Sequence, residues 1–276
     1  MSQQIKYGKI GVKTEDAQKL GNFTLDKNVN VSYNLFHVFK FHAFKQIKRG
    51  DTIVRANVFG YVFTNPINGM INNASFAEED YPEPHDFKDA LMRECVRIIN
   101  DDATEDKPSL QKEGQTLEAP SFVPLDKLQK DVFEWMLLNL IVKKKYYIQS
   151  AKGYDSGARE AVFTFKKKDF LEYGSVGCFA VPLFHLAYKH PNSTRTFKRE
   201  TLGCSGEIIG DELKCSKSKL FGKCESFPDN VCSVCGNPFC NEHGKQCEKC
   251  GAFLCKDCVV SKGLISKHYF CSKCAS

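Results

Sequence analysis

The chain has 276 residues, of which 42% are hydrophobic and 12% aromatic, so it can bury a real core and is not a disordered protein. Residues 1–16 are polar and charged, and the most apolar run, residues 132–142, is about half the length that a membrane span needs. We therefore expect no transmembrane segment and an intracellular protein with reduced thiols, in the cytoplasm or nucleus.

Charge is segregated along the chain, whose formal net charge is +6. Residues 1–76 carry +6, residues 77–120 carry −8, residues 143–199 carry +8 and residues 204–276 carry +2. Blocks of one sign suggest a basic face that meets a polyanion, although exposed lysines also serve solubility alone.

In the first quarter of the chain, alternating β-branched and aromatic residues predict strands at 5–13 and 53–63, with a turn at 49–51. Gly60 inside the second strand indicates a bulge or a close backbone approach. Residues 33–47 fit either a strand or a helix, and we favour the helix. The apolar face of that helix would consist of Phe36, Phe39, Ala43 and Ile47.

A helix is predicted at residues 86–99, with Asp86 as its N-cap. It is followed by residues 100–120, which are acidic, contain two prolines and show no apolar period. This composition is typical of a linker or a long loop.

A second helix is predicted from residue 124 to about residue 142, and a strand at 161–165. Residues 176–188 are apolar and are expected to lie in the core. Cys95 and Cys178 stand in apolar surroundings and are expected to be buried thiols.

The last 45 residues hold five paired metal-ligand motifs at near-regular intervals. A Cys-x2-Cys turn places two thiolates where both can bind one tetrahedral Zn²⁺, and five such pairs in succession are specific for metal binding. So short a segment buries too little apolar area to fold alone, and structural zinc supplies about 10–16 kcal/mol per site. The pairs are Cys232/Cys235, Cys240/His243, Cys247/Cys250, Cys255/Cys258 and Cys271/Cys274.

Ten ligands exceed the eight that two tetrahedral sites require. Cys215 and Cys224, just upstream, would raise the number to twelve and complete a third site. We therefore expect two zinc ions, with a third if these upstream cysteines take part.

Four of the pairs resemble a FYVE-type zinc finger, a cross-brace module of the treble-clef kind, over residues 232–276. The resemblance implies that Cys232, Cys235, Cys255 and Cys258 share one zinc. It implies that Cys247, Cys250, Cys271 and Cys274 share the other. It also implies binding to a phosphoinositide membrane.

The chain departs from the FYVE pattern at the positions that recognise lipid. Residues 241–246 contain no Arg where the family carries a basic motif, and residues 227–230 lack the expected WxxD element. We therefore expect this segment to share the fold of FYVE-type zinc fingers but not their lipid specificity. A RING-type ubiquitin ligase needs a longer first loop than the four residues between Cys235 and Cys240.

Residues 143–168 mix lysines with tyrosines, as suits single-stranded nucleic acid, where cations follow phosphates and rings stack on bases. The alternative is a strand surface with lysine stems lying over core aromatics. The candidate contact residues are Lys143, Lys144, Lys145, Tyr146, Tyr147, Lys152, Lys166, Lys167 and Lys168.

No HExxH motif, nucleophile elbow or nucleotide fingerprint is present, so nothing in the sequence argues for an enzyme. We expect an α+β body at residues 1–203, a connector at 204–231 and a small zinc-stabilised cross-brace module at 232–276. The function that this organisation suggests is a non-enzymatic, nucleic-acid-associated regulatory factor whose zinc module docks a protein partner. The alternatives are a phosphoinositide-binding trafficking adaptor and a ubiquitin-system scaffold.

Overall fold

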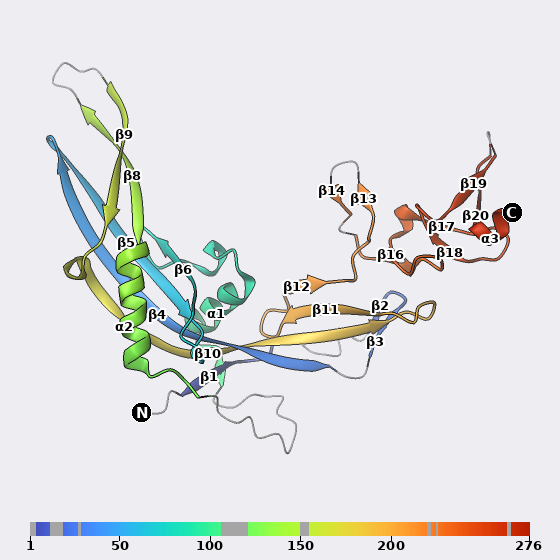
Figure 1. The fold of residues 1–276 in the computed structure, drawn as a ribbon, viewed down its shortest axis with the longest axis horizontal. Helices are drawn as coiled ribbons and strands as arrows, with labels where there is room; N and C mark the ends of the chain where they lie inside the picture. The colour runs from blue at the N-terminus through green and yellow to red at the C-terminus, as the bar shows by residue number, and fades with distance from the viewer. Residues whose placement is uncertain are drawn as a thin grey trace. The chain divides into compact units, whose positions relative to one another are not determined.

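The computed structural model describes residues 4–11, 19–26, 29–105, 121–149, 155–219, 222–224, 226–263 and 266–276. The chain divides into two compact units, each built from two stretches of sequence. Unit 1 comprises Met1–Lys9 and Tyr33–Pro182, and unit 2 comprises Ile10–Ser32 and Leu183–Ser276. Strands dominate over helices, which agrees with an α+β class in broad terms (Figure 1).

Unit 1 is built on an antiparallel sheet in the order β10–β4–β5–β6. A short strand β1 runs parallel to β10, and β7 pairs with β1. The strand bounds are β1 Ile5–Gly8, β4 Asn30–Arg49, β5 Thr52–Thr64, β6 Ile71–Ala77, β7 Thr104–Glu105 and β10 Phe170–Lys189.

The helix favoured for residues 33–47 is wrong, because this segment lies within strand β4. Phe36, His37, Val38 and Phe39 are all buried in succession. A strand covered on both faces shows a continuous apolar run instead of an alternating one, and such a run can imitate a helical face.

Two glycines set the geometry of the β4–β5 hairpin. Gly50 has φ +62° at its predicted turn, a conformation that glycine adopts without strain. At Gly60 a Cβ would stand 2.6 Å from both the Phe41 ring and the Ser75 carbonyl oxygen, so the predicted close approach is confirmed.

Two helices and a second hairpin complete unit 1. Their bounds are α1 Ala90–Asn100, α2 Leu125–Asn139, β8 Ile141–Gln149 and β9 Asp155–Thr164, with 3-10 turns η2 Pro84–Asp86 and η3 Lys167–Asp169. The predicted helix to residue 142 therefore ends earlier, and Val142 belongs to β8. The prediction that Asp86 caps α1 is wrong, because Asp89 accepts the capping hydrogen bond from the Met92 N–H at 3.0 Å.

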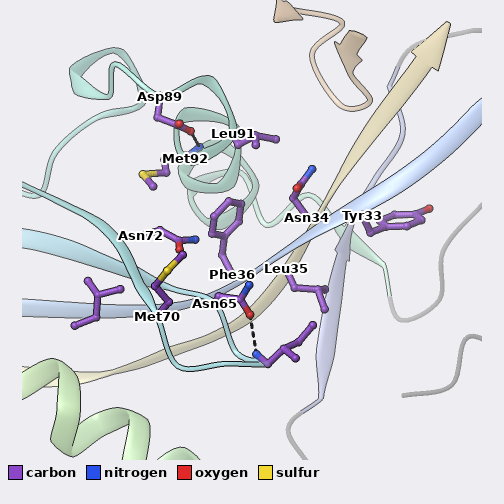
Figure 2. A pocket seen from close by; sticks show the side chains of 12 residues that line it. Tyr33, Asn34, Leu35, Phe36, Asn65, Met70, Asn72, Asp89, Leu91 and Met92 are labelled. Atoms are coloured by element: carbon purple, nitrogen blue, oxygen red, sulfur yellow. Dashed lines mark hydrogen bonds between the residues drawn. The ribbon is translucent and has the colours of Figure 1, made fainter. Parts of the chain in front are cut away.

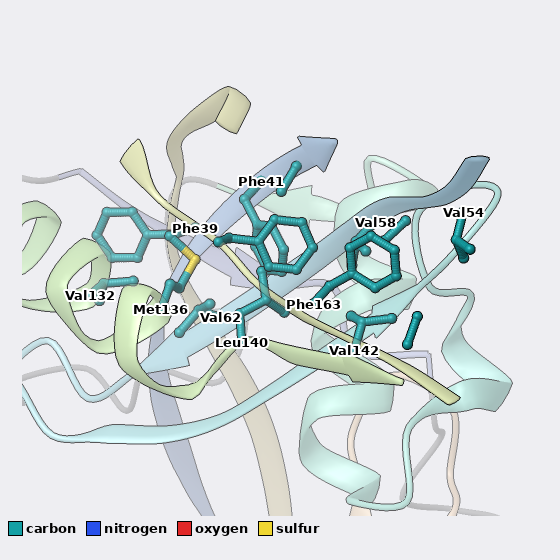
Figure 3. Close-up of a cluster of buried hydrophobic side chains, with 14 of the residues drawn as sticks. Phe39, Phe41, Val54, Val58, Val62, Val132, Met136, Leu140, Val142 and Phe163 are labelled. Atoms are coloured by element: carbon teal, nitrogen blue, oxygen red, sulfur yellow. The ribbon is translucent and has the colours of Figure 1, made fainter. Parts of the chain in front are cut away.

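The main core of unit 1 lies between the sheet and the layer formed by α2 and the β8–β9 hairpin (Figure 3). Leu128, Val132 and Met136 recur every fourth residue of α2 and bury one face of the helix. They pack on Phe39, Phe41 and Val62 of the sheet, with Val142 and Phe163 from the hairpin. A hydrogen bond from the Tyr173 hydroxyl of β10 to the Gln129 carbonyl of α2, at 2.6 Å, adds to this apolar burial.

The first part of unit 2 consists of strands, which are β2 Lys19–Leu20, β3 Phe23–Leu25, the end of β10, β11 Thr196–Leu202 and β12 Ile208–Asp211. Its apolar core gathers Phe23, Phe184, Tyr188, Phe197 and Leu213. The C-terminal part consists of short hairpins: β13 Ser218–Lys219, β14 Gly222–Lys223, β15 Asn230–Val231, β16 Pro238–Phe239, β17 Gly244–Gln246, β18 Phe253–Cys255, β19 Val260–Lys262 and β20 His268–Phe270, with η4 Asn241–His243 and α3 Ser272–Ala275.

The division between the units does not follow the boundary expected at residue 203. Unit 2 includes residues 10–32 and the end of β10 as well as the cysteine-rich segment. The predicted connector at 204–231 belongs to unit 2 and supplies buried cysteines to it.

Of the predicted acidic linker, residues 106–120 lie outside the described residues. Among the described residues, no helix combines the length and apolarity needed to cross a membrane.

Candidate metal centres

Twelve side chains of the C-terminal segment gather into three groups of four, and within each group all ligand atoms lie within 4.8 Å of one another. Centre I contains Cys215, Cys224, Cys240 and His243. Centre II contains Cys232, Cys235, Cys255 and Cys258, and centre III contains Cys247, Cys250, Cys271 and Cys274.

Distances within the groups match a ligand tetrahedron around a small ion. Zinc–sulfur bonds of about 2.3 Å at tetrahedral angles place two sulfurs about 3.8 Å apart. The Sγ–Sγ separations are 3.9 Å for Cys224–Cys240, 3.7 Å for Cys235–Cys255 and 3.8 Å for Cys250–Cys271. One donor set has three cysteines and a histidine and the other two have four cysteines, and both kinds are those of structural zinc sites.

The histidine joins centre I through Nδ1, which lies 3.4 Å from the Cys215 sulfur and 3.3 Å from the Cys240 sulfur. His243 ends the 3-10 turn η4, for which Cys240 is the N-cap, so one tight turn delivers both ligands. All four side chains of centre I are buried. A buried set of three thiols and one imidazole nitrogen suits a bound Zn²⁺.

Tight turns present the cysteine pairs of centres II and III. Gly236 and Gly251 follow the second cysteine with φ +71° and +72°, and their N–H groups bond to the carbonyls of Cys232 and Cys247. A residue with a Cβ would be strained at this φ, which explains the glycine that follows the first Cys-x2-Cys pair of each of these two centres.

Backbone N–H groups around these turns favour the thiolate form. The backbone N–H of Cys271 is the main cause that lowers the pKa of Cys247 to about 6. Burial opposes ionisation of Cys232, but the N–H groups of Cys235, Cys255 and Val234 lower its pKa to about 7. These two cysteines are therefore favoured as thiolates, the form of cysteine that binds metal. In the same two centres, burial raises the pKa of Cys258, and a hydrogen bond with the Cys271 thiol raises the pKa of Cys274.

The three centres are interleaved along the chain. The ligand pairs follow one another in the order I, II, I, III, II, III. In every centre, the two ligand pairs are therefore separated in the sequence by at least one pair of another centre. Between its own two pairs, centre II encloses one pair of centre I and one pair of centre III. Phe239 packs among the ligands of centres I and II, and Leu254 among those of centre III.

Centres II and III group their cysteines as the FYVE resemblance implied. Centre I lies outside that resemblance, because two of its ligands come from upstream of residue 232. The upstream cysteines, suggested from the excess of ligands, are thus brought together with the Cys240/His243 pair.

In the predicted nucleic-acid segment, successive residues of β8 lie on opposite faces of the β8–β9 hairpin, so each face carries both lysine and tyrosine. Lys143 is 64% exposed and Tyr147 58%, and Lys145 is also exposed. Lys144 is 27% exposed and forms an ion pair with Glu78 at 2.5 Å, while Tyr146 packs against the core of unit 1. Lys166, Lys167 and Lys168 lie around η3 and are all exposed, and Lys152 lies outside the described residues.

Two other features of the structure were not visible in the sequence. In unit 2, Ser32 Oγ lies 2.7 Å from His185 Nε2, and His185 Nδ1 lies 3.1 Å from Glu200 Oε1. This order of groups resembles a hydrolase triad. All three side chains are at least partly exposed on a strand surface, so the arrangement supports no catalytic assignment.

A cavity of about 700 Å³ lies in unit 1 beside the N-terminus of α1 (Figure 2). Asn34, Asn65 and Asn72 line it together with Phe36 and Met92. None of its lining residues is Lys or Arg, so it does not suit a phosphate group.

In comparisons with known proteins, no family model, no curated protein and no solved structure matches this chain.

Proposed function

We propose that this protein is a zinc-binding, non-enzymatic factor that associates with single-stranded nucleic acid. In this proposal, three zinc ions fold the C-terminal segment, which docks a protein partner. The outward face of the β8–β9 hairpin contacts the nucleic acid. The observation that carries the proposal is the combination of three complete four-ligand groups with an exposed row of lysines and a tyrosine.

Zinc is the metal that the ligand groups fit best. Eleven thiols and one imidazole form closed sets of four with no carboxylate among them. Hard cations such as Ca²⁺ and Mg²⁺ require oxygen ligands, whereas Zn²⁺ takes sulfur and nitrogen in tetrahedral sets. Closed sets of four leave no open coordination position for a substrate, which favours a structural role over a catalytic one.

The hairpin surface suits an extended strand of nucleotides. Lys143, Lys145 and Tyr147 alternate along β8, so they share the face that points away from the core. Tyr147 stands at a register shift between β8 and β9, and such bulges redirect a side chain outward. Exposed rings offer stacking surfaces to bases while the flanking cations attract phosphates. Glu160 lies 3.5 Å from Lys143 and reduces its free charge.

The C-terminal segment is a poor surface for phosphate once metal is bound. Eleven thiolates and three Zn²⁺ ions together subtract five charges from the +2 of residues 204–276, which leaves about −3. A negative surface disfavours both nucleic acid and a phosphoinositide headgroup. We therefore assign protein docking to this segment, and a FYVE-like lipid adaptor is the alternative.

The proposal is tested by binding of the full-length, zinc-loaded protein to a labelled single-stranded oligonucleotide over a salt series. Loss of two phosphate contacts in a Lys143→Ala/Lys145→Ala variant should reduce the slope of log affinity against log salt by roughly 1.4. Tyr147→Ala should weaken binding by about 1–3 kcal/mol at every salt concentration and leave the slope unchanged.

The matched control is Lys127→Ala/Lys130→Ala, which removes the same charge from positions on α2. Equal effects of both double variants would indicate a general charge effect and contradict the assigned face. A wild-type affinity that does not change with salt would rule out phosphate contact. Sedimentation with phosphoinositide liposomes, absent from liposomes of neutral lipid, would support the lipid adaptor instead.

A further inference from the structure

Asp229 precedes the first ligand of centre II in the sequence, but its carboxylate holds the turn that carries two ligands of centre I. Its Oδ2 accepts a hydrogen bond from the Asn241 N–H at 2.8 Å. Asn241 is the first residue of the 3-10 turn η4, whose N-cap is Cys240 and whose last residue is His243. Asp229 therefore fixes the start of the segment between these two ligands.

This hydrogen bond meets a need that the turn itself does not meet. The N–H of the first residue of a helical turn has no acceptor within that turn, so a nearby side-chain oxygen stabilises the turn by accepting from it. The carboxylate of Asp229 comes from a neighbouring segment and takes this role for Asn241. The Asp229 N–H also donates to the Phe239 carbonyl at 3.0 Å, so two hydrogen bonds align Asp229 with the start of the turn.

The main chain of Asp229 also holds the β2–β3 hairpin of the same unit. Its carbonyl accepts a hydrogen bond from the Asn22 side-chain amide at 3.0 Å. The Phe227 ring lies edge-on to Phe23, with 6.0 Å between the ring centroids, and a Cβ at Gly21 would stand 3.6 Å from the Phe227 ring. Strands β2 and β3 have two and three residues, and so short a hairpin is not stable alone. The hairpin therefore depends on contacts such as these.

We propose that Asp229 couples centre I to the β2–β3 hairpin, so that metal at centre I orders residues 19–25. Metal joins the ligands at the two ends of η4 and restricts this turn. The restricted turn presents the Asn241 N–H that holds Asp229, and the carbonyl of Asp229 in turn holds Asn22. The coupling is reciprocal, so a formed hairpin also favours metal at centre I. This inference rests on the proposed binding of zinc at centre I, and Asp229 acts as a positioning residue.

The effect should be largest at strand β2 and the turn that follows it. Strand β3 is also held by β10, where Leu25 stands opposite Tyr188, and Phe23 packs in the apolar core of unit 2. Within the part of the chain that the structure describes, β2 pairs with β3 alone. Loss of metal from centre I is therefore expected to loosen β2 and the turn at Asn22 without unfolding the strands of unit 2.

The test uses the full-length protein loaded with ¹¹³Cd²⁺ and labelled with ¹⁵N in histidine. His243 is the one histidine among the twelve ligands, so the ¹¹³Cd resonance that couples to ¹⁵N identifies centre I. Titration with a chelator measures the metal affinity of this centre. Hydrogen exchange measured by mass spectrometry reports the opening of residues 19–25, and exchange in β11 is the reference for unfolding of unit 2 as a whole.

Asp229→Ala removes the acceptor and should weaken metal binding at centre I by about 10-fold. It should raise exchange in residues 19–25 by a similar factor and leave β11 unchanged. Asp229→Asn keeps an oxygen acceptor and should recover most of both losses. Glu248→Ala is the matched control, because Glu248 accepts from the Tyr269 N–H at 3.0 Å beside a ligand of centre III. It should leave centre I and the hairpin unchanged.

Removal of metal from centre I gives the converse test. Cys224→Ser disables this centre without altering η4, and should raise exchange in residues 19–25. The rise should be smaller in an Asn22→Ala background, where the bond to Asp229 is already lost, and Asn22 is exposed, so its replacement leaves the core intact. Equal rises in both backgrounds, or a rise in β11 as large as that in residues 19–25, would overturn the inference.

Failure of the proposed function gives a different result. If no ¹¹³Cd resonance couples to histidine ¹⁵N, centre I does not bind metal and the proposal of three zinc ions itself fails. If centre I fills, and residues 19–25 exchange at the same rate with and without its metal, only the coupling fails.

Discussion

His37 of strand β4 is a buried base whose protonation should destabilise unit 1. Its side chain is 2% exposed, and Nε2 lies 2.7 Å from Ser175 Oγ. Burial lowers the pKa of His37 to about 4 from the ordinary value of 6.5. Between these two pH values the unfolded chain binds the proton and the folded chain does not. The free energy of unfolding of unit 1 should therefore fall by roughly 3 kcal/mol as the pH decreases from 6.5 to 4.

Replacement of His37 by Asn should remove this pH dependence, whatever its effect on stability at neutral pH. Trp135 is the only tryptophan and packs against the core of unit 1, so its fluorescence during urea unfolding reports on this unit. The control is His85→Asn, because that side chain is 82% exposed. A pH slope of the His37→Asn variant that equals the wild-type slope would assign the acid sensitivity to other groups.

At the scale of the element, the sequence predicted those elements whose signals are local. A helix near residue 124 and a strand at 53–63 were predicted from patterns within one segment, and α2 and β5 confirm them, although α2 ends before residue 142. The N-cap of α1 was misplaced by three residues, because Asp86 and Asp89 both precede apolar positions and only the folded loop decides which one accepts from the helix. Asp86 instead accepts from the Glu83 N–H and closes the η2 turn.

Residues 33–47 of strand β4 were predicted as a helix because the strands that pair with β4 are not recognisable from its own sequence. It pairs with β5 on one side and with β10 on the other, and β10 is about 140 residues away in sequence. As an inner strand of a sheet covered on both faces, β4 buries successive residues and loses the alternation that marks a half-exposed strand. The ligands of the metal centres were recognisable because Cys-x2-Cys and Cys-x2-His spacing is a local signal in the sequence.

The interleaved order of the ligand pairs makes centre II central to the C-terminal hairpins, since its loops enclose pairs of both neighbours. Cys255→Ser should therefore lower the zinc content of the full-length protein by more than one equivalent. Cys274→Ser alters centre III, which is interleaved with centre II alone, and should lower the zinc content by about one. Elemental analysis after gel filtration measures both, and a loss of one equivalent in each variant would show that the centres fold independently.

At the scale of the whole molecule, each unit is assembled from segments that are far apart in sequence. Strands β4 and β10 contribute residues to both units, and residues 10–32 join the unit that carries the metal centres. Composition and charge reveal blocks along the chain, but they do not show that Leu20, Phe23 and Leu25 pack with apolar residues of β10 and β11. The boundary expected at residue 203 marks the point where the cysteine-rich segment starts. The two compact units instead divide the chain within strands β4 and β10 and near residue 10.

The two units rely on different sources of stability, so removal of metal should affect them unequally. Unit 1 buries the apolar residues of α2, the β8–β9 hairpin and the sheet, whereas the hairpins of centres I to III have small clusters formed mostly by the ligands themselves. Structural zinc supplies folding free energy that such clusters lack. A strong chelator should therefore make residues 204–276 sensitive to protease and leave the urea midpoint reported by Trp135 nearly unchanged, with a shift in unfolding free energy below about 1 kcal/mol. Restoring zinc under reducing conditions should restore protease resistance. A large loss of Trp135 stability after chelation would instead show that metal supports the folding of both units.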